Sequence, residues 1–193
     1  MARKVNFREQ VPSFLIVCEG TETERLYFQE FRVGRVLDVT VEGLGKSPKQ
    51  LVIDAIKLKD KEDYEQVWVV FDIDDNKAGQ VNEAILRADN NGINVVYSNQ
   101  AFELWYLLHF DYHSTSIDRD QYMQRLSRKL SMKYDKNMPG LYVRLLGNQR
   151  VAIQNAERLL SSYDHPNPCK DDPCTTVFRL VEELIRYSRD SRR

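Results

Sequence analysis

The stretch QVWVVFDIDDN, residues 66–76, constrains the fold more than any other part of the chain. Its apolar run, residues 67–71, predicts a buried strand over residues 66–72, and three carboxylates stand at the end of this strand and just beyond it, at Asp72, Asp74 and Asp75. Clustered carboxylates need water, protons or a cation, so this strand must lead from a core to a polar edge. A parallel sheet covered by helices provides such an edge, because its sites lie at the carboxyl ends of its strands.

The rest of the N-terminal half alternates between strand-like and helix-like segments. Further strands are expected within residues 13–20, 35–45 and 93–99, and helices within 21–32, 47–63, 79–92 and 101–110. Thr21 or Thr23 is expected to cap the first helix. This alternation predicts an α/β domain, residues 1–112, with a parallel sheet of about four strands flanked by helices.

The pattern changes after Asp111. Helices are expected within residues 118–134, 148–163 and 174–189, whereas residues 164–173 contain three prolines and exclude regular structure. The second half, residues 113–193, is therefore predicted to be a helical extension packed on the same core.

Composition excludes several classes of protein. No segment approaches the roughly 18 consecutive apolar residues of a membrane span, and the N-terminus lacks an apolar signal core, so we expect a cytoplasmic protein. Three cysteines are too few for a disulfide framework, and a zinc site at Cys169 and Cys174 has little support. A phosphate-binding P-loop motif is absent from the sequence.

The acidic residues after the buried strand suggest a metal site. Asp72 and Asp74 lie two positions apart, so in an extended strand they project to the same side, about 6 to 7 Å apart. Carboxylate oxygens suit Mg²⁺ or Mn²⁺. Glu19, at the end of another expected strand, provides a third carboxylate, and Asp75 and Glu103 are candidate additional ligands. For any one Asp alone, a helix cap or turn is the more common role.

Basic residues are concentrated between Arg119 and Lys136, with tyrosines among them. Such a surface suits nucleic acid, and Lys133, Lys136 and Arg144 are the candidate phosphate contacts, although a solvated helix face is an equally good interpretation of each residue alone. Cys18 and His109 fall within apolar segments and are expected in the core.

Four segments together resemble the RloB-like family, whose layout is that of Toprim domains. They are FLIVCEGTETERLYFQEF, VWVVFDIDD, NVVYSNQAFELWYLLHF and the late NP…TTVFRLVEEL. The resemblance implies a Toprim-like fold that binds a divalent metal, with Glu19, Asp72 and Asp74 at the motif positions. Asn99, Phe102 and Glu103 also fall on a motif of the family. Gln100 stands where proline is expected, and the spacing between Asn167 and Thr175 is longer than in the usual motif.

Family resemblance and acidic pattern together lead us to expect a Mg²⁺- or Mn²⁺-dependent nuclease that hydrolyses DNA or RNA in an anti-phage or abortive-infection system. Glu19, Asp72 and Asp74 would be catalytic, and a defence-system ATPase or another protein would be the partner. The main alternative is a non-catalytic, metal-binding sensor or adaptor subunit of a defence complex. A phosphoryl-transfer pocket like that of response-regulator receivers ranks lower, because their acidic pair usually follows the first strand.

Overall fold

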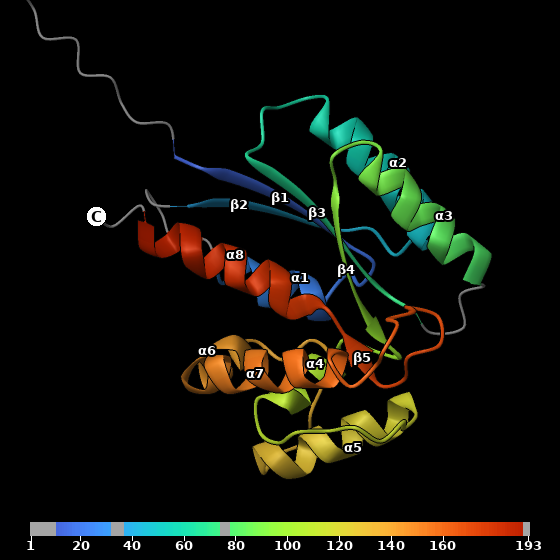
Figure 1. Cartoon of the computed structure of the whole chain (residues 1–193). Coiled ribbons are helices and arrows are strands. Elements are labelled where there is room, and N and C mark those ends of the chain that lie inside the picture. Colours follow the sequence, from blue (N-terminus) through green and yellow to red (C-terminus); the bar gives the residue numbers. More distant parts are fainter. Residues whose placement is uncertain (1–10, 32–36, 74–77, 191–193) are drawn as a thin grey trace, which may run out of the picture.

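The computed structural model describes residues 11–31, 37–73 and 78–190 (Figure 1). Its centre is one sheet in the order β2-β1-β3-β4-β5, in which the first four strands are parallel and β5 is antiparallel to β4. The strands are β1 (Ser13–Cys18), β2 (Asp38–Gly43), β3 (Gln66–Asp72), β4 (Asn94–Asn99) and β5 (Cys174–Thr175). The predicted α/β class and parallel sheet are confirmed.

Helices cover both faces of the sheet. In Figure 1, α2 and α3 lie on one side, α1 and α8 on the other, and α5 is furthest from the sheet. The helices are α1 (Thr23–Gln29), α2 (Pro48–Lys59), α3 (Ala78–Asp89), α4 (Glu103–Leu108), α5 (Arg119–Leu130), α6 (Leu141–Leu145), α7 (Gln149–Leu160) and α8 (Val177–Asp190), with a short 3-10 helix, η1 (Leu146–Asn148), after α6. None of the helices in these ranges combines the length and apolar character needed to cross a bilayer.

The alternation of side chains along β1 explains the two hydrophobic clusters. Leu15 and Val17 face α2 and α3, whereas Phe14 and Ile16 belong to the larger cluster on the opposite face. That larger cluster also contains residues of α7 and α8, so the second half of the chain shares its core with the first. The predicted domain boundary after residue 112 stays a prediction.

The segment before α8 corrects one expectation. Cys174 and Thr175 were expected to begin the last helix, but they form β5 at the edge of the sheet. The backbone N–H of Thr176 donates to the Tyr97 carbonyl at 2.9 Å, and the Tyr97 N–H donates to Thr176 Oγ1 at 3.0 Å. Backbone groups at the edge of β4 need partners, and pairing with this segment supplies them. Helix α8 therefore starts only at Val177.

The expected threonine cap of α1 was also wrong. Glu22 occupies the N-cap position, and no side-chain hydrogen bond caps the helix. Thr23 is instead buried in the first turn, and its carbonyl accepts a hydrogen bond from the Tyr106 hydroxyl at 3.1 Å. Packing against α4 therefore decides the position of Thr23.

Candidate functional site

The carboxyl edge of the sheet brings Glu19 and Asp72 together. Strands β1 and β3 are neighbours, with Cys18 opposite Val70. The Glu19 N–H donates to the Val70 carbonyl at 2.9 Å, and the Asp72 N–H donates to Glu19 Oε2 at 3.2 Å. Two carboxylates that are distant in sequence thus lie side by side, because parallel pairing aligns the ends of their strands.

Two more carboxylates reach the same place from helices. Glu24, in the first turn of α1, is buried and accepts a hydrogen bond from the Gly20 N–H at 3.3 Å. Glu103, the first residue of α4, is buried and accepts one from the Tyr134 hydroxyl at 3.2 Å. With Glu19 and Asp72 they line one hollow of about 370 Å³, which we call the acidic cavity. Glu22, which is 46% exposed, is a fifth carboxylate in its lining. The other lining residues are Gly20, Thr21, Thr23, Phe102, Arg119, Lys136 and Asn137.

Glycine at position 43 lets the wall of the acidic cavity approach β2. A Cβ atom at Gly43 would lie 2.6 Å from the Gly20 carbonyl oxygen and 2.7 Å from the Thr21 Cα atom. Both are backbone atoms and cannot rotate away. The loop that follows Glu19 therefore depends on the missing side chain at the end of β2.

Two carboxylates of the acidic cavity, Asp72 and Glu24, have raised pKa values. Burial, followed by the charges of Glu24 and Glu103, holds the pKa of Asp72 well above its ordinary value, although Arg119 opposes the shift. Burial is also the main reason why the pKa of Glu24 rises to about 7, with Glu103 and Glu19 adding to it. At neutral pH the cavity therefore gathers more acidic groups than it can keep ionised without protons or cations.

Two basic side chains, Arg119 and Lys136, line the acidic cavity together with the carboxylates. Arg119 Nη2 lies 3.5 Å from Asp72 Oδ2, and Lys136 Nζ lies 3.8 Å from Glu103 Oε1. Both cations are partly exposed, so each pair adds little to stability. Their position at the mouth of an acidic hollow gives them access to an incoming anion.

The donor chemistry suits a hard divalent cation, since carboxylate oxygens are the ligands that Mg²⁺ and Mn²⁺ prefer. In residues 11–31, 37–73 and 78–190, however, no group of three or more His, Cys, Asp or Glu side chains is assembled that could hold a metal ion. Glu19 and Asp72 both line the acidic cavity, and the Glu19 carboxylate accepts a hydrogen bond from the Asp72 backbone N–H, so these two residues are the natural pair to hold such an ion. Asp74, the predicted partner of Asp72, lies outside the described residues.

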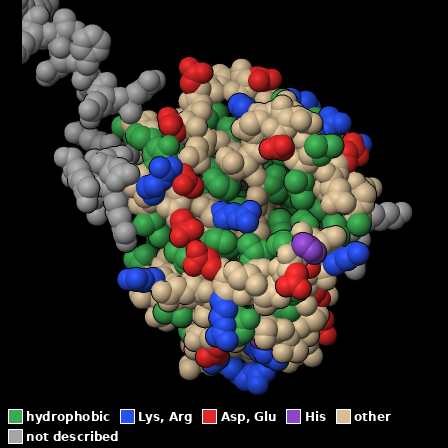
Figure 2. Space-filling model, viewed as in Figure 1, with side chains coloured by type: hydrophobic (Ala, Val, Ile, Leu, Met, Phe, Trp, Pro, Cys, Tyr) green, Lys and Arg blue, Asp and Glu red, His purple; other side chains and the backbone are tan. Residues whose placement is uncertain are grey.

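The other predicted site residues are dispersed. Lys136 and Glu103 line the acidic cavity, whereas Lys133 is exposed in the loop after α5 and Arg144 is exposed on α6, and neither lines it. Asp75, like Asp74, falls outside the described residues. Figure 2 shows Lys and Arg side chains gathered over α5, at the lower end of the molecule.

Sequence reasoning missed Glu24 as a site residue. Its place in the first turn of α1 indicates by itself only a favourable interaction with the positive end of the helix dipole, but the residue lines the acidic cavity. The available signal was its place in the first turn of a helix that directly follows a strand, since such turns border the carboxyl edge of a sheet.

Three residues of the family motifs hold the end of β4 and the segment that precedes α8. Asn99 Nδ2 donates to the Asp171 carbonyl at 2.9 Å, and the hydroxyls of Ser98 and Thr175 lie 2.9 Å apart. Asn167 Oδ1 accepts a hydrogen bond from the Cys169 N–H at 3.1 Å. Asn99, Asn167 and Thr175 therefore position backbone, whereas Phe102 lines the acidic cavity itself.

The prediction that Cys18 and His109 lie in the core is confirmed. Both side chains are buried, and His109 Nδ1 lies 2.9 Å from the Trp105 carbonyl oxygen. Burial lowers the pKa of His109 to about 4, so the ring is neutral at physiological pH. Cys169 and Cys174 are both free thiols, and Cys174 is buried.

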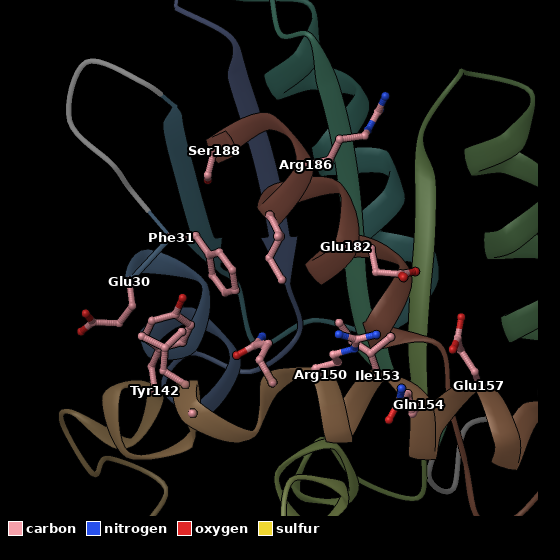
Figure 3. Close-up of a pocket in the computed structure, with 14 residues that line it drawn as sticks. Glu30, Phe31, Tyr142, Arg150, Ile153, Gln154, Glu157, Glu182, Arg186 and Ser188 are labelled. Atoms are coloured by element: carbon pink, nitrogen blue, oxygen red, sulfur yellow. The ribbon is translucent and has the colours of Figure 1, made fainter. Parts of the chain in front are cut away.

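A larger hollow lies elsewhere, between α7 and α8. Figure 3 shows this groove, of about 1080 Å³, with Phe31 and Tyr142 at one end and Glu157 and Glu182 at the other. None of the five carboxylates of the acidic cavity lines it. The groove and the acidic cavity are therefore separate features.

Fold and site together define an α/β protein with a carboxylate-lined cavity at the carboxyl edge of a mainly parallel sheet. The sequence profile of the RloB-like protein family matches residues 14–184. The chain therefore belongs to the RloB-like family, and the match includes all five carboxylates of the acidic cavity. No curated protein matches the chain, and no solved structure matches it.

Proposed function

We propose that this protein is a divalent-metal-dependent nuclease that hydrolyses phosphodiester bonds of DNA or RNA, as a Toprim-like member of a bacterial anti-phage or abortive-infection system. The observation that carries the proposal is the convergence of Glu19, Glu24, Asp72 and Glu103 on one cavity. Burial and mutual repulsion raise the pKa values of Glu24 and Asp72, and a bound cation would relieve both effects.

In this proposal, Glu19 and Asp72 hold Mg²⁺ or Mn²⁺, together with Asp74, and Asp75 and Glu103 are further candidate ligands. Bound in this position, the metal would supply positive charge to the phosphate and lower the pKa of a water molecule. Glu19 could instead accept a proton from the attacking water. When a nucleic-acid strand enters the acidic cavity, Arg119 and Lys136 would exchange their carboxylate partners for phosphate oxygens. This exchange would place the substrate at the carboxylates of the cavity.

Purified protein tests the proposal directly. With Mn²⁺ or Mg²⁺, the wild type should cut supercoiled plasmid or tRNA, and Asp72→Asn should not. The neutral amide removes a charge whose burial is costly, so the variant should fold at least as well as the wild type. Asp89→Asn is the matched control, because Asp89 is exposed at the end of α3. Undiminished cleavage by Asp72→Asn would exclude Asp72 from the reaction.

The alternative is a non-catalytic sensor or adaptor subunit in the cytoplasm, bound to a defence-system ATPase or a similar protein. One observation favours it: Arg119 and Lys136 already pair with carboxylates of the acidic cavity. Metal titration by calorimetry separates the two functions when it is combined with the cleavage assay. Metal binding without cleavage of plasmid, oligonucleotide or tRNA would support the adaptor role.

A further inference from the structure

A second charged hollow lies on α5, at a distance from the acidic cavity. It has a volume of about 460 Å³ and is lined by Leu107, Asp111, His113, Arg125, Arg128 and Lys129. We call it the α5 cavity. It shares no lining residue with the acidic cavity, and it belongs to the basic surface at the lower end of the molecule in Figure 2.

The α5 cavity has an excess of positive charge. Of its three basic side chains, Lys129 pairs with Asp111, which is the single carboxylate in the lining. Arg125 and Arg128 form no ion pair with any residue that the structure describes. His113 adds no charge at neutral pH, because burial and the neighbouring Arg125 lower its pKa. Two guanidinium groups therefore lack a counter-charge in one hollow, which is the arrangement that attracts an anion.

Arg125 is also held in place. Its Nη1 atom lies 3.2 Å from His113 Nδ1, and because a guanidinium group can only donate, the imidazole nitrogen is the acceptor. This contact uses one of the five N–H groups of a half-buried Arg125 and restricts its side chain. The remaining N–H groups form a planar donor surface that matches the oxygens of a phosphate.

Two helices connect the α5 cavity with the acidic cavity. Helix α4 begins with Glu103 in the acidic cavity and continues to Leu107 in the α5 cavity. Helix α5 begins with Arg119, which contacts Asp72, and presents Arg128 nine residues later. Nine helical residues span about 13 Å, roughly the rise of four nucleotides in one strand.

We propose that the α5 cavity binds a backbone phosphate of a nucleic-acid strand, about four nucleotides from the bond that lies at the acidic cavity. This inference rests on the proposed nuclease function. It adds a second position, away from the acidic cavity, at which the same nucleic-acid strand is bound. The α5 cavity has no role in the chemistry, and its contribution is to affinity and register. Its ligand is therefore the phosphodiester backbone, irrespective of base sequence.

The test is binding in the presence of EDTA, where cleavage cannot interfere. Fluorescence anisotropy measures the Kd for labelled single-stranded DNA, duplex DNA and tRNA over a range of salt concentrations. The double variant Arg125→Gln/Arg128→Gln loses one phosphate contact and should make the slope of log K against log salt less negative by about 0.7 for a single strand. At 0.1 M salt that change corresponds to about 5-fold weaker binding. Arg128→Gln alone, at an exposed position, should show about half of the slope change.

A matched control removes the same charge elsewhere. Arg87→Gln/Arg150→Gln loses two exposed guanidinium groups, on α3 and α7, and should bind nearly as the wild type does. The proposal is overturned if the two double variants show equal Kd values and equal slopes, or if the wild type binds none of the three probes. Equal affinity of the wild type for a mononucleotide and for a long strand would also overturn it.

The experiment separates this site from the nuclease proposal. Asp72→Asn should bind the strand at least as tightly as the wild type in EDTA and should fail only in cleavage. If the wild type binds through Arg125 and Arg128 but never cleaves, the nuclease function fails and the phosphate site stands. If it cleaves and the double variant binds normally, the phosphate site fails and the nuclease function stands.

Discussion

Neutralising Glu24 should stabilise the protein, and the gain should depend on pH. The carboxylate is buried, four other carboxylates line the same cavity, and its pKa rises from 4.5 to about 7. Glu24→Gln keeps the shape of the side chain and an oxygen that can accept the Gly20 N–H. The substitution removes only the charge that the folded protein must bury above neutral pH.

The magnitude follows from linkage between protonation and folding. Between pH 4.5 and pH 7, Glu24 is deprotonated in the unfolded chain but still protonated in the folded protein. The unfolded state therefore binds fewer protons, and the free energy of unfolding falls as pH rises through this range. For pKa values of 4.5 and about 7, the fall between pH 5 and pH 8 is about 2.5 kcal/mol, a large share of a typical stability of about 5 to 15 kcal/mol.

Urea unfolding at pH 5 and at pH 8 measures the effect. Glu24→Gln should stabilise the protein by about 2 to 3 kcal/mol more at pH 8 than at pH 5, relative to the wild type at each pH. Glu42→Gln is the control, because that carboxylate is exposed on β2 and does not line the acidic cavity. Its effect should be similar at both pH values. An effect of Glu24→Gln that is the same at pH 5 and pH 8 would refute burial of the charge as the cause.

Two further predictions concern Gly43, which lies beside the acidic cavity, and the metal ion that we propose to bind in it. Gly43→Ala should cost about 1 to 3 kcal/mol in urea unfolding, because the new Cβ atom would meet the Gly20 backbone at 2.6 Å. Gly79→Ala, where no atom lies within 4 Å, should be neutral or stabilising by up to about 1 kcal/mol, and an equal loss in both variants would contradict this explanation. Mn²⁺ at a hundredfold excess over its Kd should stabilise the wild type by about 2.7 kcal/mol, which thermal unfolding detects, and Asp72→Asn should lose most of this gain. A full gain in Asp72→Asn would show that the ion binds elsewhere.

Local periodicity was enough to predict most of the regular structure. The apolar run before Asp72 predicted β3 with the bounds that the structure has, and the neighbouring patterns predicted the other three parallel strands. The same patterns placed Glu19 and Asp72 at the carboxyl ends of strands. These features depend on residues that are close in the chain, so the sequence records them directly.

The short strand β5 and the contribution of Glu24 could not be predicted in this way. The two residues of β5 are strand-forming because β4 offers an open edge, which no local pattern reveals. Glu24 suits a helix start in any amphipathic helix, and only the packing of α1 beside the carboxyl edge turns its carboxylate into the cavity. Arg119 and Lys136 likewise reach the acidic cavity because α5 and the loop after it pack across its mouth.

By itself, the sequence therefore determined the class of fold, the position of two carboxylates at strand ends and the family resemblance. The tertiary structure decided which strands are neighbours, and hence that Glu19 lies beside Asp72. It also decided that five carboxylates share one cavity while Arg125 and Arg128 share another. The physical reason is that periodicity reports which face of an element is buried, whereas a site depends on which elements pack together.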